Sequence, residues 1–239
     1  MTVAVLGCSF AALSLSAWAA DKKTKTAASP GVDSGSFGVF IKGQRVLTES
    51  FHIEQANGLS TIKAQLKDAT SSSTVQKCEL AITSSGDLIH YDWSQDSDGS
   101  LTVVPSNDFL IEKITLTAGA KTSEQPFLMP ISTMILDNNF FVLREVLAWR
   151  YLATVCKPEG CPQTPIEFGV LVPQDHTSLR VRVELVGKEK VSVHGAEREL
   201  LRINLTGETF EWSLWVDAQD HFKLMRVTIP ADNTEVIRD

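Results

Sequence analysis

The pattern that decides the fold is clearest in Leu179-Arg180-Val181-Arg182-Val183-Glu184-Leu185, where apolar and charged residues alternate. Successive side chains of a β-strand point to opposite faces, so this stretch predicts a strand with one buried face and one wet face. Similar alternation recurs on both sides of it, for example over residues 166–172 and 37–41. Such alternation is typical of an antiparallel sheet that is exposed to water on one side.

Turn signals separate these alternating segments at short intervals. Asn57-Gly58 lies between two of them and predicts a tight hairpin, because both residues tolerate positive φ. Short connections favour a meander of roughly thirteen antiparallel strands. A long meander twists and curls. We therefore predict a mainly β fold, a curved and partly closed sheet (a half-barrel) packed around one buried helix.

The helix is predicted at about residues 137–153, where the alternation breaks. Asp137 is placed to cap its first turn. The segment is apolar around most of its circumference, which indicates a helix buried against the sheet. We assign residues 36–239 to a single β-rich domain that contains this inserted helix.

The first residues resemble an export signal. Residues 3–15 are apolar or small and uncharged, and Ala17-Trp18-Ala19 offers small residues at a cleavage site. We predict a signal peptide over residues 1–19 with cleavage near Ala19, then a flexible tether over residues 20–35. This predicts a periplasmic or secreted protein without a transmembrane segment after cleavage. Whether Cys8 carries a lipid stays open.

The net charge bears on the partners of the protein, and the cysteines bear on its compartment. The formal net charge of −7 disfavours nucleic acid as a partner. Cys156 and Cys161 bracket a Pro/Gly turn, which predicts a disulfide in an oxidising compartment. The alternative for this pair, a metal site, would need two more ligands nearby. Cys78 lies on the apolar side of a predicted strand, as a buried structural thiol does.

Several motifs resemble exported bacterial proteins of unknown function. They lie mostly in the C-terminal half, and the residues are Leu136–Phe141, Trp149–Tyr151, Val172–Asp175, Leu214–Asp217 and Arg226–Pro230. That resemblance implies neither a known chemistry nor catalytic residues. The predicted architecture is also similar to the curved sheet of periplasmic lipoprotein carriers, which hold acyl chains. This second likeness is an analogy of architecture, and architecture does not imply function.

Two patterns suggest chemistry without establishing it. His90 and Asp92 share one face of a predicted strand. A general base and its orienting carboxylate would be placed in this way, and so would a polar pair on the solvent face. Asp92, Asp96 and Asp98 match half of a calcium loop, but Pro105 occupies the position where a bidentate Glu is wanted. We therefore predict no catalytic, cofactor-binding or metal-ligating residue, and no cofactor.

Our leading hypothesis is a non-enzymatic module outside the cytoplasm. It would bind a lipid or other apolar molecule, or a partner in the cell envelope, in a cavity between the sheet and the helix. The alternatives are a hydrolase that uses His90 or His176 with a carboxylate, and a structural protein-interaction domain that pairs through free strand edges. The residues predicted to line the apolar cavity are Phe140, Leu143, Leu147, Trp149, Tyr151, Trp212 and Leu214.

Overall fold

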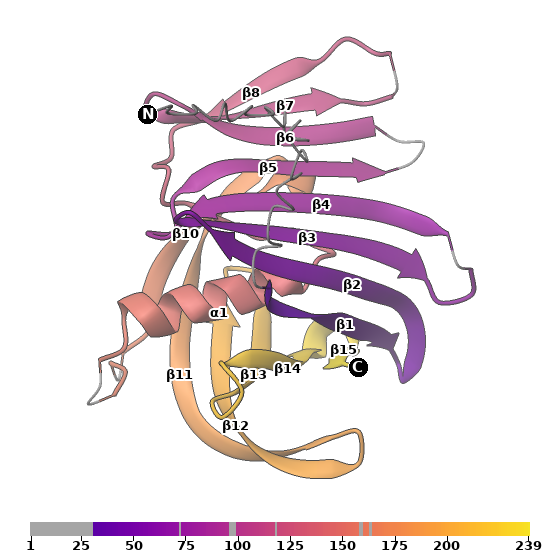
Figure 1. The fold of residues 1–239 in the computed structure, drawn as a ribbon, viewed down its shortest axis with the longest axis vertical. Coiled ribbons are helices and arrows are strands. Elements are labelled where there is room, and N and C mark those ends of the chain that lie inside the picture. Colours follow the sequence, from indigo (N-terminus) through magenta and orange to yellow (C-terminus); the bar gives the residue numbers. More distant parts are fainter. Residues whose placement is uncertain (1–30, 72, 96–98, 118, 158–159, 163) are drawn as a thin grey trace, which may run out of the picture.

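The computed structural model describes residues 31–239 apart from residues 72, 96–98, 118, 158–159 and 163, so the predicted signal peptide and residues 20–30 lie outside it. The described residues form fifteen strands, one α-helix and two 3₁₀ turns (Figure 1). The N-terminal strands are β1 (Gly31–Ile41), β2 (Gln44–Ala56), β3 (Leu59–Asp68), β4 (Thr74–Thr83), β5 (Leu88–Gln95), β6 (Gly99–Ser106), β7 (Phe109–Thr115) and β8 (Ser123–Phe127). Then follow β9 (Met134–Ile135), α1 (Val142–Thr154), β10 (Ile166–Val172), η1 (Pro173–Asp175), β11 (Thr177–Val193), β12 (Ala196–Thr206), β13 (Glu211–Asp217), β14 (Lys223–Ile229), η2 (Pro230–Asp232) and β15 (Thr234–Arg238).

All fifteen described strands belong to one sheet, in the order β8-β7-β6-β5-β4-β3-β2-β1-β15-β14-β13-β12-β11-β10-β9. The first and last strands meet at its centre, where Phe37 lies opposite Arg238. Neighbouring strands are antiparallel except β9 and β10, which are parallel. The order is that of an up-and-down barrel opened between β8 and β9, which confirms the predicted curved, partly closed meander.

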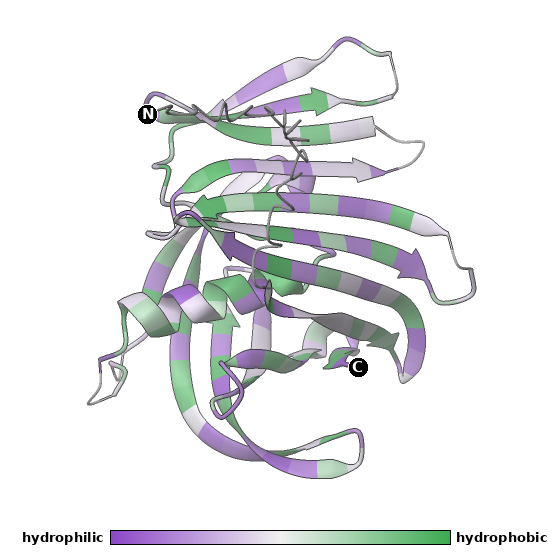
Figure 2. Ribbon diagram, in the orientation of Figure 1, coloured by the Kyte–Doolittle hydropathy of each residue, from purple (hydrophilic) through white to green (hydrophobic). Residues whose placement is uncertain are grey.

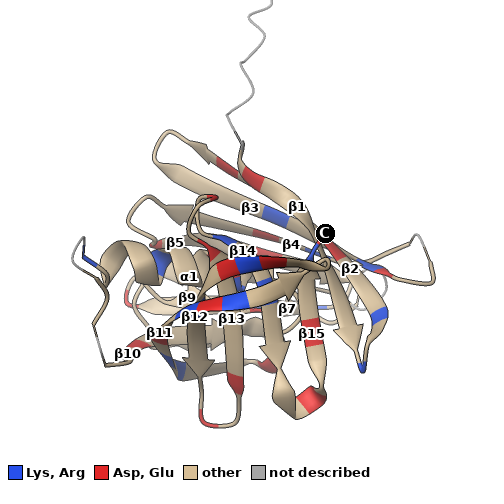
Figure 3. Cartoon of the chain, turned by 90° about the horizontal axis from the view of Figure 1, so that it is seen from below, with Lys and Arg blue, Asp and Glu red and all other residues tan. Residues whose placement is uncertain are grey.

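The alternation seen in the sequence sets which face of the sheet is buried. Ile53, Ile62, Leu80, Tyr91 and Val103 lie opposite one another across β2 to β6 and are all buried. Figure 2 shows apolar and polar residues alternating along these strands. Figure 3 shows acidic and basic residues interspersed along the strands of the sheet.

The Asn57-Gly58 turn joins β2 to β3 as predicted. Both residues have positive φ, 52° and 76°, which is the geometry of a type I′ hairpin turn. The twist of this turn matches the right-handed twist of the two strands. They pair from Leu47 opposite Asp68 to Ala56 opposite Leu59.

Helix α1 is buried inside the curved sheet, as its apolar composition predicts, but it begins at Val142 rather than near Asp137. Asp137 is not its cap, because its carboxylate accepts the backbone N–H of Asn139 before the helix starts. A second difference concerns the predicted tether over residues 20–35. Strand β1 already begins at Gly31, where it pairs with β2 opposite Glu54.

The two cysteines after the helix form the predicted disulfide, Cys156–Cys161. Cys78 is a free, buried thiol, and its burial raises its pKa well above the ordinary value. Within the described residues, none of the helices has both the length and the apolar character needed to span a bilayer.

Candidate functional site

A pocket of about 390 Å³ lies between α1 and the ends of β2, β3 and β4. Its wall on the helix consists of Val146, Trp149, Arg150, Ala153 and Thr154. These positions follow the i, i+3, i+4, i+7, i+8 spacing of a single helix face. The opposite wall and floor combine polar turn residues with five large apolar side chains, which are Ile53, Leu59, Ile62, Ile82 and Met134.

Two turns form the rim of this pocket and are hydrogen-bonded to each other. The Ser84 N–H donates to the Gly58 carbonyl at 2.8 Å, which joins the β4–β5 turn to the β2–β3 turn. On the other side, the Trp149 indole N–H donates to the Phe222 carbonyl at 2.9 Å. The indole is therefore held in place at the pocket by the loop between β13 and β14.

Arg150 carries a charge into an otherwise neutral lining. Its Nη1 donates to the Gly86 carbonyl and lies 3.3 Å from the Met134 sulfur. Gly86 permits this close approach, because a Cβ at that position would lie 2.7 Å from Nη1. Among the described residues that line the pocket, none is Asp, Glu, Lys or His.

The other end of α1 rests on a buried carboxyl group. Glu49 of β2 is fully buried, and its two oxygens accept the N–H groups of Phe141 and Val142 at 2.6 and 3.0 Å. These are donors that a helix start leaves unpaired. Burial raises the pKa of Glu49 to about 8, although the two backbone hydrogen bonds oppose the shift.

Arg144 lies beside this carboxylate and is fully buried. Its Nη1 donates to the carbonyls of Asp137 and Phe140, and its guanidinium stacks 4.6 Å from the centre of the Trp212 ring. Desolvation lowers its pKa to about 10. The Asp137 carboxylate accepts hydrogen bonds from the Tyr91 hydroxyl and from Gln174.

A second buried cluster joins the first turn of α1 to the central strands. Arg238 of β15 pairs with Asp33 of β1 at 2.6 Å and with Glu145 of α1 at 3.4 Å. Burial, followed by the neighbouring Asp33, raises the pKa of Glu145 to about 9. Both clusters lack access to water, so they tie the helix to the sheet and offer no site to a ligand.

The structure separates the seven residues predicted to line an apolar cavity. Five of them are fully buried in the core, and these are Phe140, Leu143, Leu147, Tyr151 and Leu214. Trp149 lines the pocket beside α1, and Trp212 lines a different hollow of about 980 Å³ next to β10 and β11. Apart from Trp149, the prediction thus selected buried core positions, and it omitted the rest of the adjacent helix face at 146, 150, 153 and 154.

The residues from the strands were also missed, although the sequence carries a signal for them. Ile53, Leu59 and Ile62 lie within a few positions of the Asn57-Gly58 turn, so that their side chains gather at one end of the sheet. Leu59 keeps 42% of its surface exposed. A large apolar residue directly after a turn is the sequence signal that could have identified this end of the molecule.

The two histidines considered for hydrolysis lie on opposite faces of the sheet. His90 is on the polar face, 3.5 Å from Glu79 and 3.6 Å from Asp92. His176 follows η1 and lies 2.9 Å from Glu112, which is buried on the inner face of β7. They do not form one cleft. Among the described residues no group of three His, Cys, Asp or Glu is placed to hold a metal, and Asp96 and Asp98 lie outside the described part.

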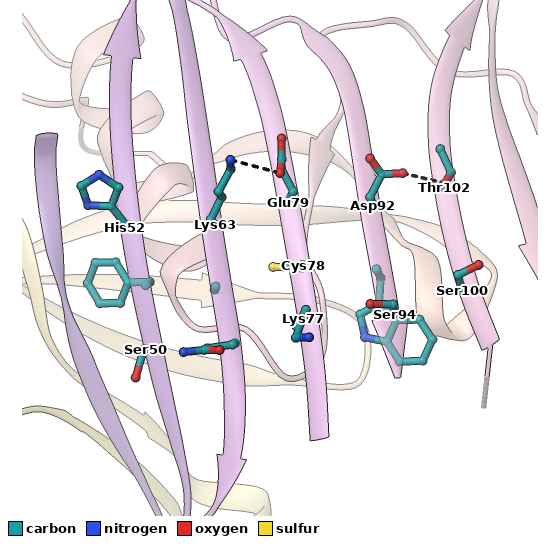
Figure 4. Close-up of a pocket in the computed structure, with 14 residues that line it drawn as sticks. Ser50, His52, Lys63, Lys77, Cys78, Glu79, Asp92, Ser94, Ser100 and Thr102 are labelled. Carbon is teal, nitrogen blue, oxygen red and sulfur yellow. Dashed lines mark hydrogen bonds and ion pairs between the residues drawn. The ribbon is translucent and has the colours of Figure 1, made fainter. Parts of the chain in front are cut away.

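A third hollow, of about 730 Å³, lies on the polar face of β2 to β6 (Figure 4). His52, Lys63, Glu79, Asp92 and Thr102 form a row across it, each opposite the next. Lys63 and Glu79 form an ion pair at 3.5 Å, and Thr102 donates to Asp92 at 2.6 Å. The charges in this row satisfy one another, as on a solvated sheet surface.

Comparison with solved structures gives a likeness in fold. The chain is similar in structure to a β-barrel-like protein of domain of unknown function DUF1849 from Brucella abortus, at 6% sequence identity and a TM-score of 0.49. The match covers 86% of this chain and 94% of that one. No protein-family model matches the chain, and neither does any curated protein. The resemblance to lipoprotein carriers stays a prediction.

Proposed function

We propose that the protein is a non-enzymatic module outside the cytoplasm that binds a small apolar or amphipathic molecule in the pocket between α1 and β2–β4. The observation that carries this proposal is the pocket lining, in which aliphatic side chains, Met134 and one indole meet hydroxyls, amides and a single arginine. Its volume of about 390 Å³ falls at the lower end of the range of about 300–1,000 Å³ for small-molecule pockets. Burial of alkyl surface would supply most of the affinity, at about 25 cal/mol per Å².

The other two hollows suit such a molecule less well. The hollow beside β10 and β11 is lined by charges of both signs, including Arg180, Arg182, Glu167, Asp175 and Glu208. The hollow on the polar face carries the charged row described above. An apolar ligand in either place would remove water from these charges without replacing their partners.

The placement outside the cytoplasm rests on two observations. The Cys156–Cys161 disulfide suits an oxidising compartment, and the apolar start of the sequence with Ala17-Trp18-Ala19 is typical of an export signal. Pairing with an envelope protein through a strand edge is less favoured. One edge strand, β8, contains Pro126, and the other, β9, has two residues.

A fluorescence experiment tests the binding site. N-phenyl-1-naphthylamine, a neutral apolar probe, should bind the purified protein, and 1-dodecanol should displace it. Ala153→Trp places a large side chain in the pocket from an exposed position and should weaken probe binding at least about ten-fold, which corresponds to about 1.4 kcal/mol.

Thr209→Trp is the matched control, because Thr209 is also exposed but lines the larger hollow beside β10 and β11. It should leave probe binding unchanged. Absence of probe binding to the unmodified protein, or loss of binding with Thr209→Trp and not with Ala153→Trp, would refute the proposed site.

A further inference from the structure

We infer that the ligand of this pocket is a single-chain amphiphile with a carboxylate head, and that Arg150 binds the head. The inference rests on the proposed function and specifies its ligand. It starts from the charge of the lining. Arg150 is the one charged side chain among the described residues around the pocket, and the surrounding groups are aliphatic side chains, amides, hydroxyls and backbone.

The guanidinium has no carboxylate partner in the described part of the chain. Arg150 takes part in none of the ion pairs there. Most arginines of the strands do form one, such as Arg45 with Asp239 and Arg202 with Glu189. Its two side-chain contacts, with the Gly86 carbonyl and the Met134 sulfur, both use Nη1. A guanidinium has five N–H donors, so donors remain for an incoming anion.

The position of Arg150 separates two chemical environments along the helix face. On one side, Val146 and Trp149 of the helix line the pocket together with the apolar residues Ile53, Ile62 and Ile82. On the other side lies the β4–β5 turn, where residues 83–85 carry hydroxyls and where Arg150 donates to the Gly86 carbonyl. An alkyl chain fits against the first group. A carboxylate at Arg150 would then meet the one cation of the lining. The nearby Asp87 carboxylate already accepts the Ser85 hydroxyl at 2.8 Å.

A neutral or cationic head fits less well. A hydroxyl gains one ordinary hydrogen bond, whereas a carboxylate gains charge-assisted bonds to a planar guanidinium that matches its geometry. An ammonium head would face Arg150 with the same charge and would find no carboxylate among the described lining residues.

The test compares three headgroups on the same dodecyl chain. Each compound is used to displace the naphthylamine probe at neutral pH, at concentrations below those at which micelles form. Dodecanoate should bind about ten-fold more tightly than 1-dodecanol, since hydrogen bonds to charged groups contribute about 1.5–3 kcal/mol. Dodecylammonium should bind more weakly than the alcohol.

Arg150→Gln should remove the preference for dodecanoate and leave the affinity for 1-dodecanol within about two-fold, and Arg150→Lys should keep part of the preference. Arg180→Gln is the matched control, because Arg180 lines the other hollow and its side chain is 81% exposed. It should change neither affinity.

The outcomes separate the two proposals. If none of the three amphiphiles displaces the probe, the proposed function itself is wrong. If the alcohol and the carboxylate bind equally, or if the ammonium binds best, binding stands and the carboxylate inference is wrong. The inference also fails if the preference survives Arg150→Gln or disappears with Arg180→Gln. Should the Arg150 variants not fold, the three heads compared on the unmodified protein still decide between a carboxylate and its alternatives.

Discussion

The two ends of α1 meet the sheet in opposite ways. At the N-terminal end, charged side chains are fully buried, and Glu49 and Arg144 bond to backbone groups of the helix start. At the C-terminal end, the helix faces a pocket lined by apolar and uncharged polar side chains, and Arg150 has no carboxylate partner among the described residues. The comparison teaches that buried polar groups tie the helix to the sheet at one end, whereas the other end leaves an arginine without a carboxylate partner among the described residues.

The largest expected effect is at the N-terminal end. Arg144→Ala would leave a cavity and would remove the cation beside Glu49 and Asp137, so we expect a loss of about 3–5 kcal/mol in the free energy of unfolding. Urea unfolding measures it. Arg180→Ala, at an exposed position, should stay within about 0.5 kcal/mol. A loss below about 1 kcal/mol for Arg144→Ala would contradict the anchoring role.

A smaller effect is expected at the C-terminal end. The disulfide closes a short loop of sequence separation 5 just after the helix ends at Thr154. Replacing Cys156 and Cys161 together by Ser should cost about 2 kcal/mol. Because this loop follows the helical wall of the pocket, probe binding should weaken as well. Unchanged affinity in the double variant would show that the pocket holds its shape without the disulfide.

The pH dependence of stability tests the buried carboxyl group at the N-terminal end of the helix. The carboxyl of Glu49 keeps its proton up to about pH 8 in the folded protein and loses it near 4.5 when unfolded. The folded state therefore holds the extra proton between these values, and stability falls as pH rises through this window, by roughly 1 kcal/mol per pH unit.

Glu145 acts in the same direction up to about pH 9. Urea midpoints measured from pH 5 to pH 8 check the prediction. Glu49→Gln should flatten the slope, even though the amide fits two helix N–H donors less well and lowers stability overall. A stability that rises with pH over this range would contradict the buried, protonated carboxyl.

The sequence predicted the sheet better than the helix start. Alternation at 179–185 and the Asn57-Gly58 turn are local signals, and the structure follows both. The start of α1 depended on a residue far away in sequence, because Glu49 caps Phe141 and Val142 across the core. Asp137 looked like the cap, and instead it bonds with Asn139 and with Tyr91.

The same distinction applies to the candidate site. The sequence identified the helix as the wall of a cavity, and Trp149 was among the residues named. Helical spacing alone did not reveal which face stays uncovered, since Leu147 and Val146 lie on different faces of the helix and are both apolar and buried. That choice follows from where β2 to β4 end relative to α1, which is a property of strand lengths and register.

The sequence by itself determined the alternation, the tight turns and the apolar helix, because each depends on side-chain periodicity and on the backbone preferences of neighbouring residues. Only the tertiary structure decided that β1 pairs with β15, that the sheet stays open between β8 and β9, and that a pocket with one arginine remains beside α1. These features need contacts between residues far apart in the chain, and such contacts leave no periodic trace along it.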